Sequence, residues 1–120
     1  MKDIVRIDCN HRMSRAVVSN GFVFVGGQTA ADSSQDIKGQ TAQVLKKIDG
    51  FLEKAGVDKT RIVSAQIWLA DIKSHFSDMN EVWDAWVPQG HTPARATVES
   101  RLALPELLIE ITVVAAVYSF

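Results

Sequence analysis

The chain has 120 residues, the size of one domain, and we expect that domain to span residues 1–120. Thirteen lysines and arginines against 14 aspartates and glutamates give a formal charge of -1, so no basic excess favours nucleic acid or an anionic membrane. A lone cysteine, Cys9, excludes an internal disulfide and a multi-cysteine zinc site, and suits the reducing cytoplasm. Residues 1–6 lack the apolar core of a signal peptide, and no apolar run approaches the ~20 residues of a membrane helix.

The first third of the chain predicts strands and a hairpin. Residues 4–8 and 15–27 have the composition of strands, and Asn20-Gly21 interrupts the second segment. This dipeptide suits the positive φ angles of a hairpin turn. Split there, the segment gives three strands before the first helix.

A helix and a strand are predicted next. Residues 36–55 carry apolar side chains at helical spacing, and Gly56 is typical of a helix C-terminus. Residues 61–69 alternate as a strand does. The more apolar face of that strand is predicted to consist of Val63, Ala65, Ile67 and Leu69.

A second amphipathic helix is predicted between Ser74, a suitable N-cap, and Pro88, with Gly90 closing the segment. Its apolar stripe is most simply explained by packing against a sheet, and a ligand-lining role is the alternative. The stripe consists of Phe76, Met79, Trp83 and Trp86.

The last third predicts strands at residues 94–103 and 107–117, separated by a turn at 104–106. The order βββαβαββ indicates the α+β class, with one mixed, antiparallel-rich sheet and two helices on one face. The last strand is apolar at both alternating positions, so its second face would expose a large apolar patch. We therefore expect a closed homo-oligomer with pockets between subunits.

Two charged residues are candidates for chemistry. Glu110 lies inside the apolar last strand, where an unpaired carboxylate costs several kcal/mol to desolvate unless it opens onto a cavity. A structural ion pair is the alternative. Arg95 begins a strand directly after a turn that contains Pro93, a position from which side chains often reach ligands. A solvated charge at the strand end is the alternative there.

The spacing of the two residues bears on where they meet. If residues 95–103 and 107–117 form an antiparallel hairpin, Glu110 pairs with Ser100. Arg95 then lies five residues along, or about 17 Å away at ~3.4 Å per residue. The two side chains would meet only across a subunit boundary or through a bulge.

Residues 92–99, Thr-Pro-Ala-Arg-Ala-Thr-Val-Glu, resemble the Pro-Ala-Arg signature of the RidA/YjgF family of imine deaminases. The resemblance extends from about residue 11 to residue 117. Four further segments resemble the family's Gly-Gln strand, central strand, second helix and Glu-containing last strand, in that order. These segments are residues 24–28, 67–71, 79–83 and 109–111.

The resemblance implies a chorismate-mutase-like homotrimer that hydrolyses small 2-imino or 2-enamino acids to 2-keto acids and ammonia at clefts between subunits. Arg95 would bind the substrate carboxylate, a role that suits its planar fork. Glu110 would position or activate the attacking water. Backbone groups near Gly27 and Thr97 would complete the pocket, and no cofactor or metal is implied.

The segment around Met13 departs from the family pattern. Residues 11–16, His-Arg-Met-Ser-Arg-Ala, stand where well-known members carry Gly-Pro-Tyr-Ser-Gln-Ala. Met13 thus replaces a tyrosine that lines the cleft in those members, which predicts a changed substrate preference or low activity. The second hypothesis is therefore a non-catalytic trimer that binds a small carboxylate.

Two other classes of function receive little support. His11, His75 and His91 lack metal-ligand spacing, so no metal site is expected. RNA cleavage, proposed for some relatives, fits poorly with the near-neutral charge, although a local basic patch with Arg12 and Arg15 keeps it open.

Overall fold

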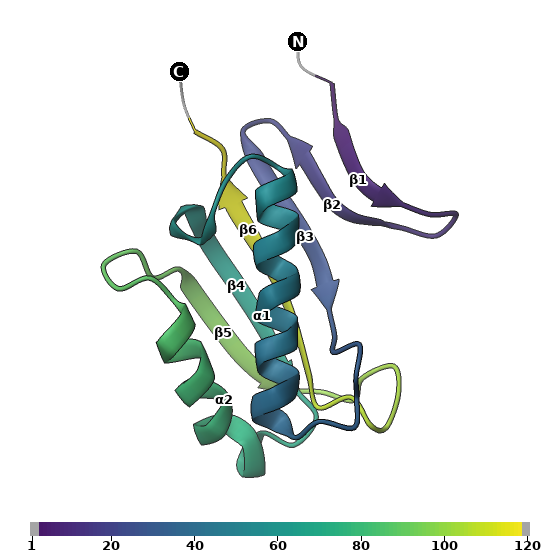
Figure 1. Ribbon diagram of the computed structural model, residues 1–120, viewed down its shortest axis with the longest axis vertical. Helices are drawn as coiled ribbons and strands as arrows, with labels where there is room; N and C mark the ends of the chain where they lie inside the picture. Colours follow the sequence, from purple (N-terminus) through teal and green to yellow (C-terminus); the bar gives the residue numbers. More distant parts are fainter. Residues whose placement is uncertain (1–2, 119–120) are drawn as a thin grey trace.

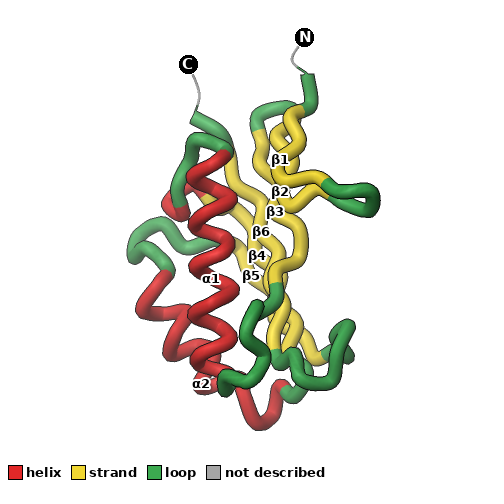
Figure 2. Tube along the Cα trace, turned by 45° about the vertical axis from the view of Figure 1, so that its right-hand side comes forward, coloured by secondary structure: helices red, strands yellow, loops and turns green. Residues whose placement is uncertain are grey.

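The fold is a two-layer arrangement of one six-stranded sheet and two helices, seen in a computed structural model that describes residues 3–118 (Figures 1 and 2). Residues 1–2 and 119–120 of the expected domain lie outside this range. The element order confirms the predicted βββαβαββ pattern and the α+β class. The strands are β1 (Val5–Cys9), β2 (Ser14–Ser19), β3 (Phe22–Gln28), β4 (Ile62–Leu69), β5 (Ala94–Glu99) and β6 (Ile109–Ala116). The helices are α1 (Ile37–Lys54), the short 3-10 helix η1 (Lys59–Arg61) and α2 (Ile72–Trp86).

The strand order is β1-β2-β3-β6-β4-β5, with β4 and β5 parallel and the other neighbours antiparallel. The predicted hairpin between the last two strands is therefore wrong. Helix α2 connects β4 to β5 and returns the chain to the same end of the sheet, so β5 forms the edge beside β4. Residues 100–108 then carry the chain past β4, and β6 inserts between β3 and β4.

Local turn chemistry fixes several boundaries as predicted. Asn20 and Gly21 adopt φ angles of 55° and 86° in the tight turn between β2 and β3. Gly56 has a φ angle of 82° directly after the C-cap of α1, the left-handed conformation that ends many helices. The predicted hairpin turn and helix stop are both confirmed.

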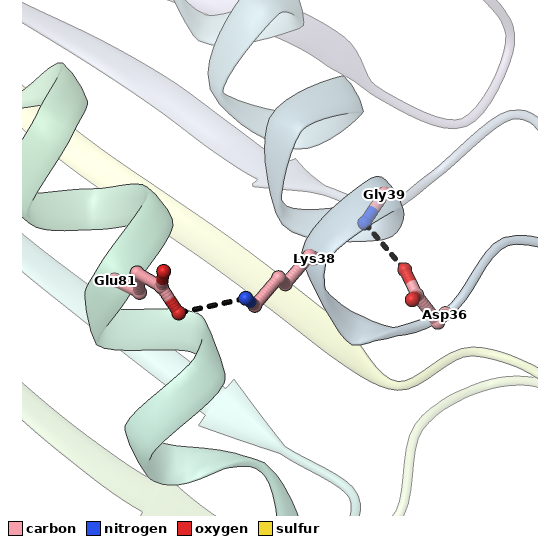
Figure 3. A network of polar contacts seen from close by, with 4 residues as sticks. All are labelled: Asp36, Lys38, Gly39 and Glu81. Atoms are coloured by element: carbon pink, nitrogen blue, oxygen red, sulfur yellow. Dashed lines mark hydrogen bonds and ion pairs between the residues drawn. The ribbon is translucent and has the colours of Figure 1, made fainter.

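The N-termini of both helices are capped by aspartate. The Asp36 side chain accepts a hydrogen bond of 2.9 Å from the backbone N–H of Gly39 (Figure 3). Helix α2 begins three residues earlier than predicted, because Asp71 rather than Ser74 is the N-cap. The Asp71 side chain accepts a hydrogen bond of 3.2 Å from the Ser74 N–H.

An exposed ion pair links the two helices. The Lys38 Nζ lies 2.7 Å from a Glu81 carboxylate oxygen, which connects α1 to α2 on their outer side (Figure 3). Both side chains are largely solvent-exposed, so the pair adds little stability.

The hydrophobic core lies between the helices and one face of the sheet. Side chains of α1 such as Val44 and Ile48 are fully buried with Ile67 of β4 and Ile111 of β6. The alternation predicted for residues 61–69 holds from Ala65 onward and fails at the start of the strand. A register irregularity against β6 there buries Ile62 and leaves Val63 exposed.

The opposite face of the sheet carries no helix, as Figure 2 shows, and it exposes several large apolar side chains. Phe22 and Phe24 of β3 lie on this face with ring centroids 6.4 Å apart and are each more than two-fifths exposed. Val98 of the edge strand is exposed to the same degree. Phe24 pairs across strands with Val114 of β6, so the apolar surface continues into the centre of the sheet. We call this surface the open face.

Candidate functional site

Arg95 lies at the beginning of β5 and turns toward the helices. Its register partner on β4 is Ala65, which is buried in the core, so the Arg95 side chain lies on the helix-covered face. An Arg95 Nη donates a hydrogen bond of 2.8 Å to the Oδ1 of Asn80 on α2. The guanidinium carbon also lies 5.3 Å from the ring centroid of Trp83, within the range of a cation–π contact. The strand-end arginine is thus partly buried and held in place by α2.

The guanidinium of Arg95 has no acidic partner within the described part of the chain, where the two ion pairs are Lys38–Glu81 and Lys54–Asp8. Burial lowers the pKa of Arg95, and the negative charge of Asp84 acts in the opposite direction. An arginine stays protonated under such shifts. The site therefore offers a partly desolvated cation with N–H donors left for a carboxylate ligand.

Glu110 lies on the open face near the middle of the sheet. It pairs with Trp68 of β4 and is half-buried, and no hydrogen bond reaches its carboxylate from residues 3–118. A Cβ added to Gly27 of β3 would lie 2.0 Å from the Glu110 Oε2. The absence of a side chain at residue 27 therefore creates the space that the Glu110 carboxylate fills.

One chain does not bring Arg95 and Glu110 together. Arg95 and Thr97 lie on the helix-covered face, whereas Glu110 and Gly27 lie on the open face. The separation arises from the two faces of the sheet and not from the hairpin geometry expected from sequence. Their meeting across a subunit boundary stays a prediction.

The seam between α2 and β5 contains a buried polar atom without a partner. At one end of the seam, the Glu99 carboxylate accepts a hydrogen bond of 3.1 Å from the Ile72 N–H. At the other end, Arg95 donates its hydrogen bond to Asn80 of α2. Thr97 lies on β5 between these two contacts, and its buried Oγ1 has no hydrogen-bond partner among residues 3–118. The buried Nδ1 of His75 on α2 has none there either. The side chain of Thr97 therefore has unused hydrogen-bonding capacity close to Arg95.

Met13 lies before β2 and is 46% exposed. Its sulfur accepts a weak hydrogen bond of 3.5 Å from an Arg15 Nη. A thioether at this position offers adaptable apolar contact in place of a hydroxyl.

Sequence reasoning missed Asn80 and Trp83 as supports of Arg95. The stripe residue Trp83 was predicted to pack against the sheet, and it is buried in the core as well as under the guanidinium. Asn80 lies three residues before Trp83, so both project from the same side of α2. An amide at helical spacing from a buried tryptophan was the available signal.

Two classes of site find no support among the described residues. No cluster of three or more histidine, cysteine, aspartate or glutamate side chains is arranged to hold a metal ion in residues 3–118. The same part of the chain contains no helix that is long and apolar enough to cross a bilayer.

Comparison with known proteins places the chain in a family. The sequence profile described as Endoribonuclease L-PSP matches residues 4–117. The RutC family protein YoaB of Escherichia coli K12 is 45% identical over 114 residues, which cover 95% of this chain and 98% of that protein. A YjgF-family protein of Neisseria meningitidis has a TM-score of 0.94 at 42% identity, with 98% of each chain covered. A YjgF/YER057c/UK114-family protein of Mycobacterium tuberculosis has a TM-score of 0.85 at 29% identity over 96% of this chain and all of that one. The chain belongs to the RidA/YjgF family, as predicted from its motifs.

Proposed function

We propose that this protein hydrolyses small 2-imino or 2-enamino acids to 2-keto acids and ammonia, without a cofactor, in the cytoplasm. One observation supports the proposal most strongly. A partly desolvated Arg95, held by Asn80 and Trp83, has no carboxylate partner within residues 3–118. A charged fork held in this way suits the carboxylate of an amino-acid-derived substrate.

The reaction needs a water molecule and a group that moves its proton. An enamino acid first tautomerises to the imino acid, whose protonated C=N carbon is electrophilic. Glu110 accepts a proton as the water oxygen bonds to that carbon, giving a tetrahedral carbinolamine. Glu110 returns this proton to the nitrogen, and as the C–N bond breaks the hydroxyl group gives up its remaining proton to Glu110 or to the departing ammonia, so that the 2-keto acid and ammonia leave. No electrons are exchanged with a second reagent, so the step needs no redox partner.

The same proposal includes a homotrimer, the assembly that the family resemblance implies. The apolar open face, with Phe22, Phe24 and Val98 exposed, would be covered by other copies of the chain. Because Arg95 and Glu110 lie on opposite faces of one sheet, a shared cleft must take Arg95 from one subunit and Glu110 from its neighbour. Gly27 would lie beside Glu110, and Thr97 beside Arg95.

A non-catalytic, carboxylate-binding trimer is the second candidate function. It is favoured by the exposed thioether of Met13, which supplies no hydroxyl to the expected cleft. This candidate keeps the binding role of Arg95 and removes the turnover.

The test measures keto-acid formation from an imino acid generated in place by an amino-acid-consuming enzyme. Arg95→Ala removes a two-pronged charged contact, so we expect kcat/KM to fall by about a hundredfold or more. Arg101→Ala is the matched control, because Arg101 is exposed outside the strands. An Arg95→Ala variant as fast as the parent would overturn the mechanism. Saturable binding of a 2-keto acid without turnover of several imines would instead favour the second candidate.

RNA cleavage is tested in the same preparation, because the family description includes the word endoribonuclease. The formal charge of -1 supplies no general attraction for RNA. We expect the rate of cleavage of single-stranded RNA not to rise with the concentration of the protein. RNA cleavage that the Glu110→Gln substitution abolishes would contradict the proposed reaction class.

A further inference from the structure

A cavity whose lining contains neither Arg95 nor Glu110 lies between α1 and the β1–β2–β3 part of the sheet. Its volume is about 400 Å³, within the range of small-molecule sites. Arg95 lies on β5, at the opposite edge of the sheet. The cavity is lined mainly by charged side chains, by Gly27 and its two following residues at the end of β3, and by one aromatic ring. Its charged and aromatic lining residues are Asp8, Arg15, Lys47, Phe51 and Lys54.

The charge of this cavity is strongly positive although the whole chain is close to neutral. Three cationic side chains line it, against a single acid, Asp8. That acid is already engaged, since its carboxylate lies 2.6 Å from the Lys54 Nζ. Arg15 has no acidic partner among the residues that the structure describes. The cavity therefore keeps an excess of positive charge and unused N–H donors.

The cationic groups are fixed to different elements, which gives the cavity a defined shape. Lys47 projects from α1, and its Nζ donates a hydrogen bond of 2.7 Å to the backbone carbonyl of Thr29, just beyond β3. Arg15 belongs to β2. The ring of Phe51, with the Lys54 Nζ 5.7 Å from its centroid, provides an apolar wall on α1.

We propose that this cavity binds a phosphate monoester of a small molecule. A phosphate monoester carries close to two negative charges at neutral pH and three strong acceptor oxygens, which match the cationic excess and the available donors. The esterified organic group would lie against Phe51, because that ring is the aromatic surface of the lining. A monocarboxylate would neutralise only part of the charge. The cavity lining contains neither Arg95 nor Glu110, and it shares only Gly27 with the pocket proposed for deamination.

The test is a calorimetric titration of the full chain with phenyl phosphate and with inorganic phosphate at low ionic strength. We expect one saturable site per chain, with phenyl phosphate binding more tightly because of Phe51. Lys47→Gln and Arg15→Gln are each expected to weaken binding about tenfold, the loss of one charge-assisted hydrogen bond. Lys46→Gln is the matched control, since it makes the same charge change one residue away on α1, outside the cavity lining.

Several results would overturn the site. Absence of saturable binding would do so, as would an equal loss of affinity in Lys46→Gln and Lys47→Gln, which would indicate diffuse electrostatics. Displacement of phenyl phosphate by a short single-stranded RNA of higher affinity would indicate a nucleic-acid surface instead. Thermal unfolding of each variant separates lost binding from lost folding. Arg95→Ala is expected to bind phenyl phosphate like the parent, so failure of this site and failure of the proposed reaction are distinguishable.

Discussion

Replacing Gly27 by alanine tests how closely β3 holds the Glu110 carboxylate. The new Cβ would lie 2.0 Å from the Glu110 Oε2 and 3.0 Å from its Cδ, whereas ordinary contact begins at 3.4 Å. The carboxylate oxygen must therefore move by about 1.4 Å, and a displacement of about 1 Å at a catalytic group typically costs about a hundredfold in rate. The obstructing atoms belong to a flexible side chain, so stability should fall by only about 0.5–1.5 kcal/mol, the cost of a distorted rotamer.

The assay pairs keto-acid formation with urea unfolding. Gly50→Ala is the control, because a Cβ at that helical position meets nothing within 4 Å and should raise stability by about 0.5–1 kcal/mol without changing activity. In a Glu110→Ala background, Gly27→Ala should cause no further loss of activity or stability, because the side chain with which the new Cβ clashes has been removed. Full activity in the single Gly27→Ala variant would refute the role given to the carboxylate position, and a large loss of stability would show that the backbone itself is affected.

The fold and its pH dependence give two more predictions. Gln40 is fully buried, and its amide group makes four hydrogen bonds to the backbone. Its Nε2 donates to the carbonyls of Ser33, Gln35 and Glu106, and its Oε1 accepts from the Leu108 N–H. Gln40→Leu should therefore lower the free energy of unfolding in urea by about 3 kcal/mol. A variant as stable as the parent would contradict this. Hydrogen bonds from the side chain and the N–H of Ser74 lower the pKa of Asp71 in the folded protein. The stabilisation that Asp71 gives the folded state is therefore fully present above the unfolded-state pKa of 3.8, and it is lost as the pH falls through the lower folded-state pKa. The Tm advantage of the parent over Asp71→Asn should therefore shrink on acidification, and a growing advantage would reverse the sign of the argument.

The elements of the fold were predictable because each has a local cause. Residues 36–55 show a helical period, and Asn20-Gly21 and Gly56 occupy left-handed backbone positions that few other residues tolerate. These signals act over a few residues and need no knowledge of the rest of the chain.

The strand order was not predictable from the same signals. Neighbouring strands in sequence suggested a hairpin at the C-terminus, yet residues 100–108 form a connection of nine residues, longer than the usual hairpin loop. The structure instead contains a parallel β4–α2–β5 unit, the arrangement that a strand, a helix and a strand of this length typically form. Only the tertiary arrangement decides that β6 takes the central position.

The candidate site was predictable at its charged residues and not at their surroundings. Glu110 was recognisable as an acid in an apolar strand, and Arg95 from its motif. The assignment of the two side chains to opposite faces depends on the strand order, which places Arg95 over Ala65 and Glu110 beside Trp68. For the same reason, the contact with Asn80 emerged only from the packing of α2 on β5.

The central claim is that Arg95 and Glu110 act together from different subunits, and mixing two inactive variants tests it directly. Arg95→Ala and Glu110→Ala chains are unfolded together in equal amounts, refolded and assayed for keto-acid formation. If each cleft takes one residue from each of two neighbours, random assembly restores about a quarter of the clefts and about a quarter of the parent activity. Mixed oligomers that form and remain as inactive as either variant alone would contradict the claim.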